Sequence, residues 1–405
     1  MKSNLKVGLV TFSTALSVIL LIGAVLGQDR ESKEPYRPLA VLSEVLSRIQ
    51  SDYVEEPNFD RVTEGALQGM VESLDPYNSY LSQANYTEYK KGWRGEASIG
   101  AVISKRFGLP GIVAVVPGGP ADRAGLVAGD IFEAISGKSS REMSYEEVLA
   151  RLDGPVGSTV SVSVVRQRSQ QPRSMELKRE VVKNPEIESR VIENGVGYLK
   201  VRAMPTGISK VLATRIETLR RVGATKFVLD LRENASGDMQ EGAAVANLFI
   251  GQGLLGYVEG QQYPRQSFLA DKTKAISAEP VTLIVNESTG GAAEFLAAAF
   301  IENHRGDVVG ARTFGIGSIQ KVVPLPNGSA LVLSVAKFHS PVGKAIQDTG
   351  VTPNEVVEQP RNIVSLTPED DVEEEAPASD QPLEDLQLKR ALELLNEAQA
   401  LPQAA

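Results

Sequence analysis

The chain of 405 residues contains no cysteine and only two histidines, His304 and His339. Disulfides, thiol catalysis and cysteine-ligated zinc are therefore excluded, and a histidine-rich metal site is excluded as well. We expect neither a metal nor a cofactor, although a catalytic histidine stays possible. An excess of positive charge is also missing, because the formal net charge is -9. Nucleic acid is therefore not expected as a partner.

Charge is absent from one long segment near the N-terminus. Two lysines precede an uncharged stretch from Val7 to Gly27, and charge returns at Asp29. At about 1.5 Å per residue, this stretch can span a hydrocarbon core of roughly 30 Å. We expect residues 1–30 to form an inner-membrane anchor in the cell envelope, with the remaining domains extracytoplasmic. A cleaved signal, which would leave a secreted protein, is the main alternative, and a buried core helix is a weaker one.

The next segment, residues 31–91, is predicted to be a helical N-terminal region. Val41, Val45 and Ile49 recur at helical spacing. A second amphipathic stretch ends at Asp75-Pro76, because proline disfavours helix in the residue before it.

Residues 92–184 have a different pattern, with short runs of β-branched residues. Ile112–Val116 and Val160–Val165 are predicted strands. A helix is predicted over Ser144–Leu152, with Ser144 as its N-cap.

Strand and helix patterns alternate over residues 185–358, which is typical of a layered α/β domain. An acidic linker is expected over residues 359–382, and an amphipathic C-terminal helix over 383–405. The fold class is therefore a multidomain α+β and α/β protein. The principal predicted elements of the α/β domain are the strands Gly197–Val201, Lys226–Leu231 and Val281–Val285, and the helices Ser209–Val222, Glu241–Ile250 and Ala292–Ile301.

The run PADRAGLVAGDI, from Pro120 to Ile131, resembles a PDZ domain of the bacterial protease type. The resemblance implies that a peptide adds to the sheet as an extra strand and that backbone N–H groups hold its terminal carboxylate. The groove helix would be Ser144–Leu152. A PDZ-like fold that binds nothing is the alternative. The implied carboxylate loop is Ser98, Ile99, Gly100 and Ala101.

Four ordered blocks downstream resemble the carboxyl-terminal processing, or tail-specific, serine protease family. They are DLRENASG from Asp230, NESTGGAAE from Asn286, GARTFGIGSIQ from Gly310, and PVGKAIQ from Pro341. The resemblance implies an α/β core with crotonase-like layering and an action on polypeptide C-termini or unfolded tails. It also implies a serine nucleophile whose proton is taken by a desolvated lysine.

The two positions that carry this chemistry are substituted. Gly291 stands at the serine position, three residues before Glu294, and Ile316 stands at the lysine position after Phe314-Gly315. Neither block needs a gap to match, so the register is fixed. Arg312 and Gln320 are retained along with Glu294. The loop implied to hold the oxyanion has changed to Ala235, Ser236 and Gly237.

The resulting hypothesis is a catalytically inactive pseudoprotease that binds polypeptide C-termini as a scaffold or as a regulator, including of an active homologue. A serine endopeptidase with a displaced catalytic dyad is the alternative, although a small displacement of a nucleophile usually ruins its geometry. A third reading is an assembly protein that self-associates through the helices of Val41–Leu74 and the C-terminal helix. Groups that could form a displaced dyad are Ser288, Ser318, Lys321, Lys337, His304 and His339.

Overall fold

The computed structural model describes residues 37–92, 95–106, 108–166, 169–359 and 384–400. The predicted membrane anchor and the acidic linker beyond Gln359 lie outside these residues. Among the described residues, no helix combines the length and the apolar character needed to cross a bilayer. The chain divides into two compact units, Met1–Thr63 and Glu64–Ala405.

The first unit contains helix α2 (Arg37–Asp52) and the start of helix α3 (Phe59–Glu72). Leu39, Val41 and Val45 of α2 are 53%, 61% and 47% exposed. The second unit contains the rest of α3, strand β1 (Ser79–Leu81) and helix α4 (Gln83–Lys90). The helical prediction for this region is confirmed for these helices, but it did not include β1.

The β-rich segment of the second unit forms a six-stranded sheet in the order β2-β3-β4-β6-β7, with β5 paired to β4. Its named pairs are antiparallel. Alternate side chains of β6, Val160, Val162 and Val164, are buried in the core of this sheet. The bounds are β2 (Ala101–Arg106), β3 (Leu109–Val115), α5 (Pro120–Arg123), β4 (Ile131–Ile135), β5 (Lys138–Ser139), η1 (Ser140–Glu142), α6 (Tyr145–Leu152), β6 (Thr159–Arg166) and β7 (Ser169–Lys178).

A second six-stranded sheet is the centre of the α/β region, in the order β17-β14-β13-β10-β9-β8. All its pairs are parallel except β8 with β9. The bounds are β8 (Glu188–Ile192), η2 (Glu193–Gly195), β9 (Val196–Lys200), α7 (Ile208–Arg221), β10 (Lys226–Asp230), α8 (Met239–Phe249), β13 (Val281–Val285), α9 (Ala292–Glu302), β14 (Val308–Gly310) and β17 (Glu355–Val356).

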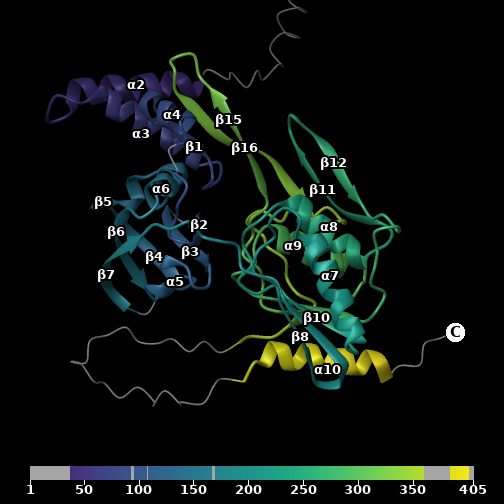
Figure 1. The fold of residues 1–405 in the computed structure, drawn as a ribbon. Helices are drawn as coiled ribbons and strands as arrows, with labels where there is room; N and C mark the ends of the chain where they lie inside the picture. Colours follow the sequence, from purple (N-terminus) through teal and green to yellow (C-terminus); the bar gives the residue numbers. More distant parts are fainter. Residues whose placement is uncertain (1–36, 93–94, 107, 167–168, 360–383, 401–405) are drawn as a thin grey trace, which may run out of the picture. The chain divides into compact units, whose positions relative to one another are not determined.

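A third sheet joins segments that are far apart in the sequence. Its order is β1-β16-β11-β12, and β15 also pairs with β16. The strands extend away from the central sheet in Figure 1. Their bounds are β11 (Leu254–Gly260), β12 (Tyr263–Leu269), β15 (Ser318–Pro324) and β16 (Ala330–His339).

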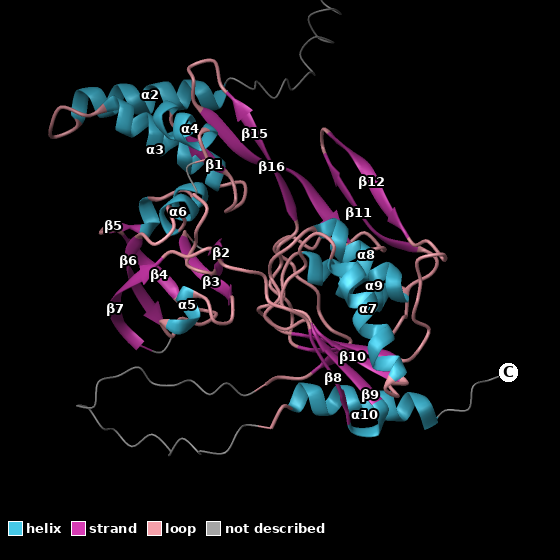
Figure 2. Cartoon of the chain, in the orientation of Figure 1, coloured by secondary structure: helices cyan, strands magenta, loops and turns pink. Residues whose placement is uncertain are grey.

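Helices cover both faces of the central sheet (Figures 1 and 2). Phe227 and Leu229 of β10 pack into the larger core with α7, α8 and α9. Val228, between them, faces the other way and packs with Ala391 and Leu395 of α10 (Leu386–Ala400). This alternation follows from the two-residue period of a strand, whose successive side chains point to opposite faces of the sheet. The C-terminal helix therefore packs on the central sheet, on the face opposite to α7, α8 and α9.

Candidate functional site

Glu294 lies at the centre of the candidate site, on the first turn of α9, and is fully buried. One of its carboxylate oxygens accepts hydrogen bonds from the backbone nitrogens of Gly291 at 2.9 Å and Ile316 at 2.7 Å. The other accepts from the nitrogen of Gly315 at 2.6 Å and from the hydroxyl of Thr313. A single carboxylate therefore holds the two substituted positions next to each other.

The environment of this carboxylate opposes its charge. Burial raises the pKa of Glu294 to about 7, although the four donors act in the opposite direction. The group therefore changes protonation state in the physiological range.

Gly291 is the N-cap of α9 and has a φ of 61° and a ψ of -123°. This backbone conformation favours glycine. A Cβ atom added at Gly291 would meet no atom within 4 Å, so there is space where the family's serine side chain would stand. The glycine itself has no atom that can attack a carbonyl.

The side chain of Ile316 lies beside the preceding glycine, Gly290, and not within 4 Å of a Cβ added at Gly291. A Cβ built on Gly290 would be 3.0 Å from Cδ1 of Ile316 and 3.1 Å from Cβ of Ala235. The isoleucine is half-buried and has no proton acceptor. The structure thus brings together the two positions that the sequence singled out, and neither carries the expected chemistry.

The surroundings of Ile316 are apolar. Ala235, Phe314 and Ile316 form one hydrophobic cluster with Val113 and Ala114 of β3. Ile316 therefore packs against a cluster that contains residues of both the β-rich sheet and the protease-like core.

Phe314 from this cluster also contacts Arg106 at the end of β2. The guanidinium lies 3.8 Å from the centre of the Phe314 ring and donates a hydrogen bond to the Phe314 carbonyl. A cleft of about 520 Å³ lies here, lined by residues that include Arg106, Arg312 and Asp348.

The other two retained residues are not joined to Glu294. Arg312 is exposed and donates to the carbonyl of Thr349 at 2.7 Å. Gln320 is exposed on β15 and donates to the hydroxyls of Ser318 and Ser334. In this structure both side chains are engaged with nearby surface groups.

The loop that follows β10 carries Ala235, Ser236 and Gly237, and its backbone is held on both sides. The nitrogen of Gly290 donates to the carbonyl of Asn234, and the nitrogen of Met204 donates to that of Ser236, both at 2.8 Å. Gly237 has a φ of 132°, and a Cβ there would lie 2.3 Å from the Met204 carbonyl oxygen. Glycine is therefore required at position 237 even though the two residues before it differ from the family pattern.

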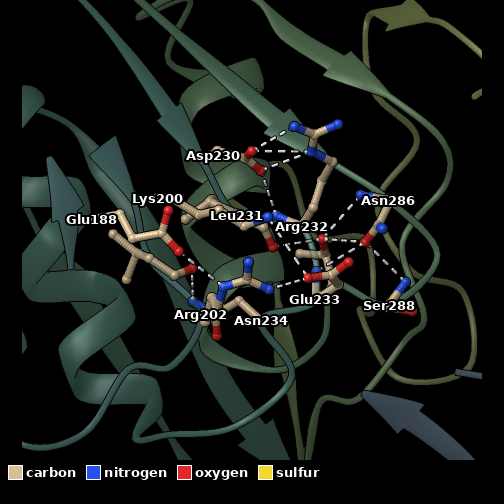
Figure 3. A network of polar contacts seen from close by, with 12 residues as sticks. Glu188, Lys200, Arg202, Asp230, Leu231, Arg232, Glu233, Asn234, Asn286 and Ser288 are labelled. Carbon is tan, nitrogen blue, oxygen red and sulfur yellow. Dashed lines mark hydrogen bonds and ion pairs between the residues drawn. The ribbon is translucent and has the colours of Figure 1, made fainter. Parts of the chain in front are cut away.

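Ionic contacts fix the start of the same loop, as Figure 3 shows. Glu233 has a positive φ of 63° and forms ion pairs with Arg202 and, at 3.7 Å, with Lys200. The amide oxygen of Asn286 accepts from the backbone nitrogens of Glu233 and Ser288. These contacts join the DLRENASG block to the NESTGGAAE block.

The groups considered for a displaced dyad do not form one. Within the described part of the chain, neither Ser288 nor Ser318 is hydrogen-bonded to a lysine or a histidine. His304 is exposed in a turn, with a φ of 51°. The ring of His339 stacks on Tyr257 at 4.8 Å, and its Nδ1 is buried without a hydrogen-bond partner. Lys321 and Lys337 are exposed on β15 and β16.

The predicted carboxylate loop precedes β2, which is the edge strand of the β-rich sheet. The backbone nitrogen of Ser98 donates to the carbonyl of Glu180, and that of Gly100 donates to the hydroxyl of Ser98 at 3.2 Å. Two of the four N–H groups of Ser98–Ala101 are therefore engaged within the domain. Helix α6 contacts β2, as a groove helix would.

Comparisons with known proteins agree with this architecture. The model for peptidase family S41 matches residues 195–357, and that for the PDZ domain matches residues 111–166. The model for the activating protease CtpB N-terminal domain matches residues 22–85.

Individual relatives cover most of the chain. A carboxyl-terminal-processing protease of Picosynechococcus sp. is 32% identical over 81% of this chain and 78% of its own length. The carboxy-terminal processing protease CtpA of Bacillus subtilis is 29% identical over 89% of this chain and 78% of its own. Among solved structures, the photosystem II D1 C-terminal processing protease is similar with a TM-score of 0.65 and 25% identity, over 78% of this chain and 86% of that one. The chain belongs to the carboxyl-terminal processing proteases of peptidase family S41, with a PDZ domain preceding the protease core.

Proposed function

We propose that this protein is a catalytically inactive member of its family that binds polypeptide C-termini and serves as a scaffold or regulator. One observation carries the proposal. Glu294 holds positions 291 and 316 side by side, yet glycine and isoleucine occupy them. A site of this kind would lack both the nucleophile and the base that the family resemblance implies.

The size of the expected defect supports this reading. Loss of the nucleophile in a serine hydrolase leaves a residual rate roughly 10³–10⁴-fold above the uncatalysed reaction, from binding and oxyanion contacts. Peptide bonds hydrolyse so slowly without catalysis that this remainder is negligible. Binding of a polypeptide tail does not need the missing groups.

A fluorophosphonate probe applied to the full-length protein in detergent tests the proposal. We expect no stable labelling of any serine. Labelling would instead establish the alternative, an active endopeptidase with a displaced dyad. The variants Ser288→Ala and Ser318→Ala would then identify the nucleophile, because only loss of the reactive serine abolishes the label.

Binding is tested separately, by affinity capture with the same protein. A mixture of acetylated random heptapeptides with a free C-terminal carboxylate is compared with the same mixture ending in an amide. Backbone N–H groups recognise a carboxylate better than a neutral amide. We expect the carboxylate peptides to be retained preferentially, and equal retention would contradict binding of C-termini.

We also propose that the protein is attached to a membrane of the cell envelope through residues 1–30. The uncharged stretch Val7–Gly27 is the support for this. Fractionation of cells expressing the full chain tests it, and release of the protein by salt alone would contradict an inserted anchor. Cleavage of the same segment as a signal peptide, followed by secretion, is the alternative.

Self-association, or association with an active homologue, is a further proposal. It rests on the exposed apolar side chains Leu39, Val41 and Val45 of α2.

The domain limits 92–184 and 185–358 are likewise proposed, and no described helix or strand crosses either limit.

A further inference from the structure

We propose that the peptide groove of the PDZ domain is partly closed by Tyr145, which a preceding strap holds in place. The strap is defined as residues Glu72–Ser79. The groove would then pair with only the last two or three residues of a polypeptide C-terminus until Tyr145 moves. This inference rests on the proposed binding of C-termini.

The first observation is a hydrogen bond on the strand edge that a peptide would use. The hydroxyl of Tyr145, the first residue of α6, donates to the carbonyl oxygen of Ile103 at 3.1 Å. Because β2 is the edge strand, a peptide that joins the sheet must bond to the outward-facing backbone groups of β2. The carbonyl oxygen of Ile103 is such an acceptor, and it is already hydrogen-bonded to the Tyr145 side chain of the same domain.

The strap holds the Tyr145 ring in this position. Tyr77 packs edge-on against Tyr145, with 5.1 Å between the ring centres. Tyr77 is 6% exposed, and its hydroxyl lies 2.8 Å from the hydroxyl of Ser104, the next residue of β2. The backbone nitrogen of Glu146 donates to the hydroxyl of Ser79. The strap therefore contacts both β2 and the start of α6.

A buried charge fastens the beginning of the strap. Lys105 of β2 is 1% exposed, and its ammonium donates to the carboxylate of Glu72 and to the carbonyl of Met143, both at 2.6 Å. Removing one partner of such a pair leaves an uncompensated charge in the interior, which is strongly unfavourable. Glu72 is therefore a firm attachment point.

These contacts define how much of the groove is available. They fall on Ile103, Ser104 and Lys105, whereas the predicted carboxylate loop Ser98–Ala101 comes before them. A strand advances about 3.3 Å per residue, so a peptide with its carboxylate at that loop reaches Ile103 after two or three residues. Longer pairing requires the Tyr145 hydroxyl to leave.

Peptide length provides the test. The full-length protein in detergent is incubated with acetylated random peptides of three or of seven residues, each with a free C-terminal carboxylate, and retention is measured by mass spectrometry. For the natural sequence we expect the two lengths to be retained to within about twofold. Tyr145→Phe frees the Ile103 carbonyl and should strengthen binding of the seven-residue peptides about fivefold, since one hydrogen bond contributes that order of affinity. Binding of the three-residue peptides should not change.

Two further variants complete the design. Tyr77→Phe loses only the contact with Ser104 and should shift the length preference in the same direction by a smaller factor. Ser163→Ala is the matched control, because it removes an exposed hydrogen bond to Glu133 on the strands β6 and β4. It should behave as the natural sequence does.

The outcomes separate the two proposals. If the natural sequence already prefers seven residues several-fold and neither tyrosine variant alters this, the inference is overturned while the binding function stands. If no variant retains carboxylate peptides over their amides at either length, the binding function itself is overturned.

Discussion

Among the individual residues, Glu294 makes the largest contribution to the geometry of the candidate site. Its carboxylate receives backbone N–H groups from α9 and from the segment Thr313–Ile316, so it connects the two halves of the site. It keeps this role although the residues that it positions have no catalytic group. Its burial makes the stability of the core sensitive to pH.

The pKa of Glu294 predicts the sign of that sensitivity. Burial raises it from 4.5 to about 7 in the folded chain. The folded state therefore binds the proton more tightly, and the stabilisation is complete below pH 4.5 and lost as pH rises through 7. We expect the free energy of unfolding to fall by about 3 kcal/mol across this window. Urea titrations at several pH values measure it.

Glu294→Gln should remove this pH dependence, because an amide does not titrate. Glu193→Gln, at an exposed position, is the control and should retain the slope of the natural sequence. A stability that rises from pH 4.5 to 7 in the natural sequence but not in Glu294→Gln would mean that the four hydrogen bonds dominate over burial.

Restoration of the two missing groups is a second prediction at this scale. Gly291→Ser places a side chain in open space, at a backbone cost of about 1–3 kcal/mol for this sparsely populated conformation. Ile316→Lys places an amine at a half-buried position beside the apolar cluster of Val113, Ala114 and Ala235, where partial desolvation should lower its pKa, as a general base requires. We expect the double variant to cleave unstructured polypeptide tails detectably, with products identified by mass spectrometry.

Each single substitution is the control for the double variant and should give no cleavage, because a serine without a base and a base without a serine are both ineffective. Equal cleavage by Ile316→Lys alone and by the double variant would show that another serine is the nucleophile.

Among the secondary-structure elements, α10 has a role that the sequence alone did not predict. Its apolar residues Ala391 and Leu395 pack on the core sheet rather than on another molecule. Arg232, from the loop after β10, donates to both Asp230 and Asp385. Asp230 is fully buried, and although burial raises its pKa, Arg232 holds that pKa below the ordinary value.

This arrangement predicts an asymmetric effect of the two ion pairs. Arg232→Met leaves the buried Asp230 without its charge partner and should reduce the free energy of unfolding by about 3–5 kcal/mol. Asp385 is 37% exposed, so Asp385→Asn should cost less than about 1 kcal/mol. Urea denaturation of the two variants measures the difference, and equal losses would contradict the argument.

The sequence predicted those elements best whose apolar pattern is local. The predicted helices Ser209–Val222, Glu241–Ile250 and Ala292–Ile301 lie within two residues of α7, α8 and α9 at each end, and Val281–Val285 coincides with β13. Strands β11 and β12 were missed, because β12 is mostly exposed and shows no apolar period. The two strands pair with each other as a local hairpin, but β11 joins the rest of its sheet through β16, which is far away in the chain.

The difference between local patterns and long-range contacts also decides which parts of the candidate site were predictable. The adjacency of Gly291 and Ile316 was predictable because gap-free family blocks fix both positions. The burial of Lys105 was not, because a lysine on a strand is ordinarily exposed and its partner Glu72 is 33 residues away. The contact between Tyr145 and Ile103 likewise depends on tertiary packing.

For the whole molecule, the position of α10 indicates whether the C-terminal helix stabilises its own chain or joins one copy of the chain to another. The helix covers Val228, Ile284 and Val309 of the central sheet. Deletion of residues 384–405 would therefore expose a core surface of the same chain. We expect the truncated protein to aggregate or unfold at a lower temperature rather than to change from an oligomer to a stable monomer.

Analytical ultracentrifugation and thermal unfolding of the full-length and truncated proteins distinguish these results. A truncated protein that is monomeric and equally stable, beside an oligomeric full-length protein, would show that the helix serves assembly instead.

The apolar contact of Ile316 has a consequence for how such a protein can change over generations. A lysine acquired at that position alone brings an amine to the apolar cluster, at a desolvation cost, and supplies a base without a nucleophile. A serine acquired at position 291 alone adds backbone strain and supplies a nucleophile without a base. Under the proposed function, each first step is therefore disadvantageous by itself, and single mutations do not readily rebuild the dyad. Selection then acts on whatever the remaining surfaces bind.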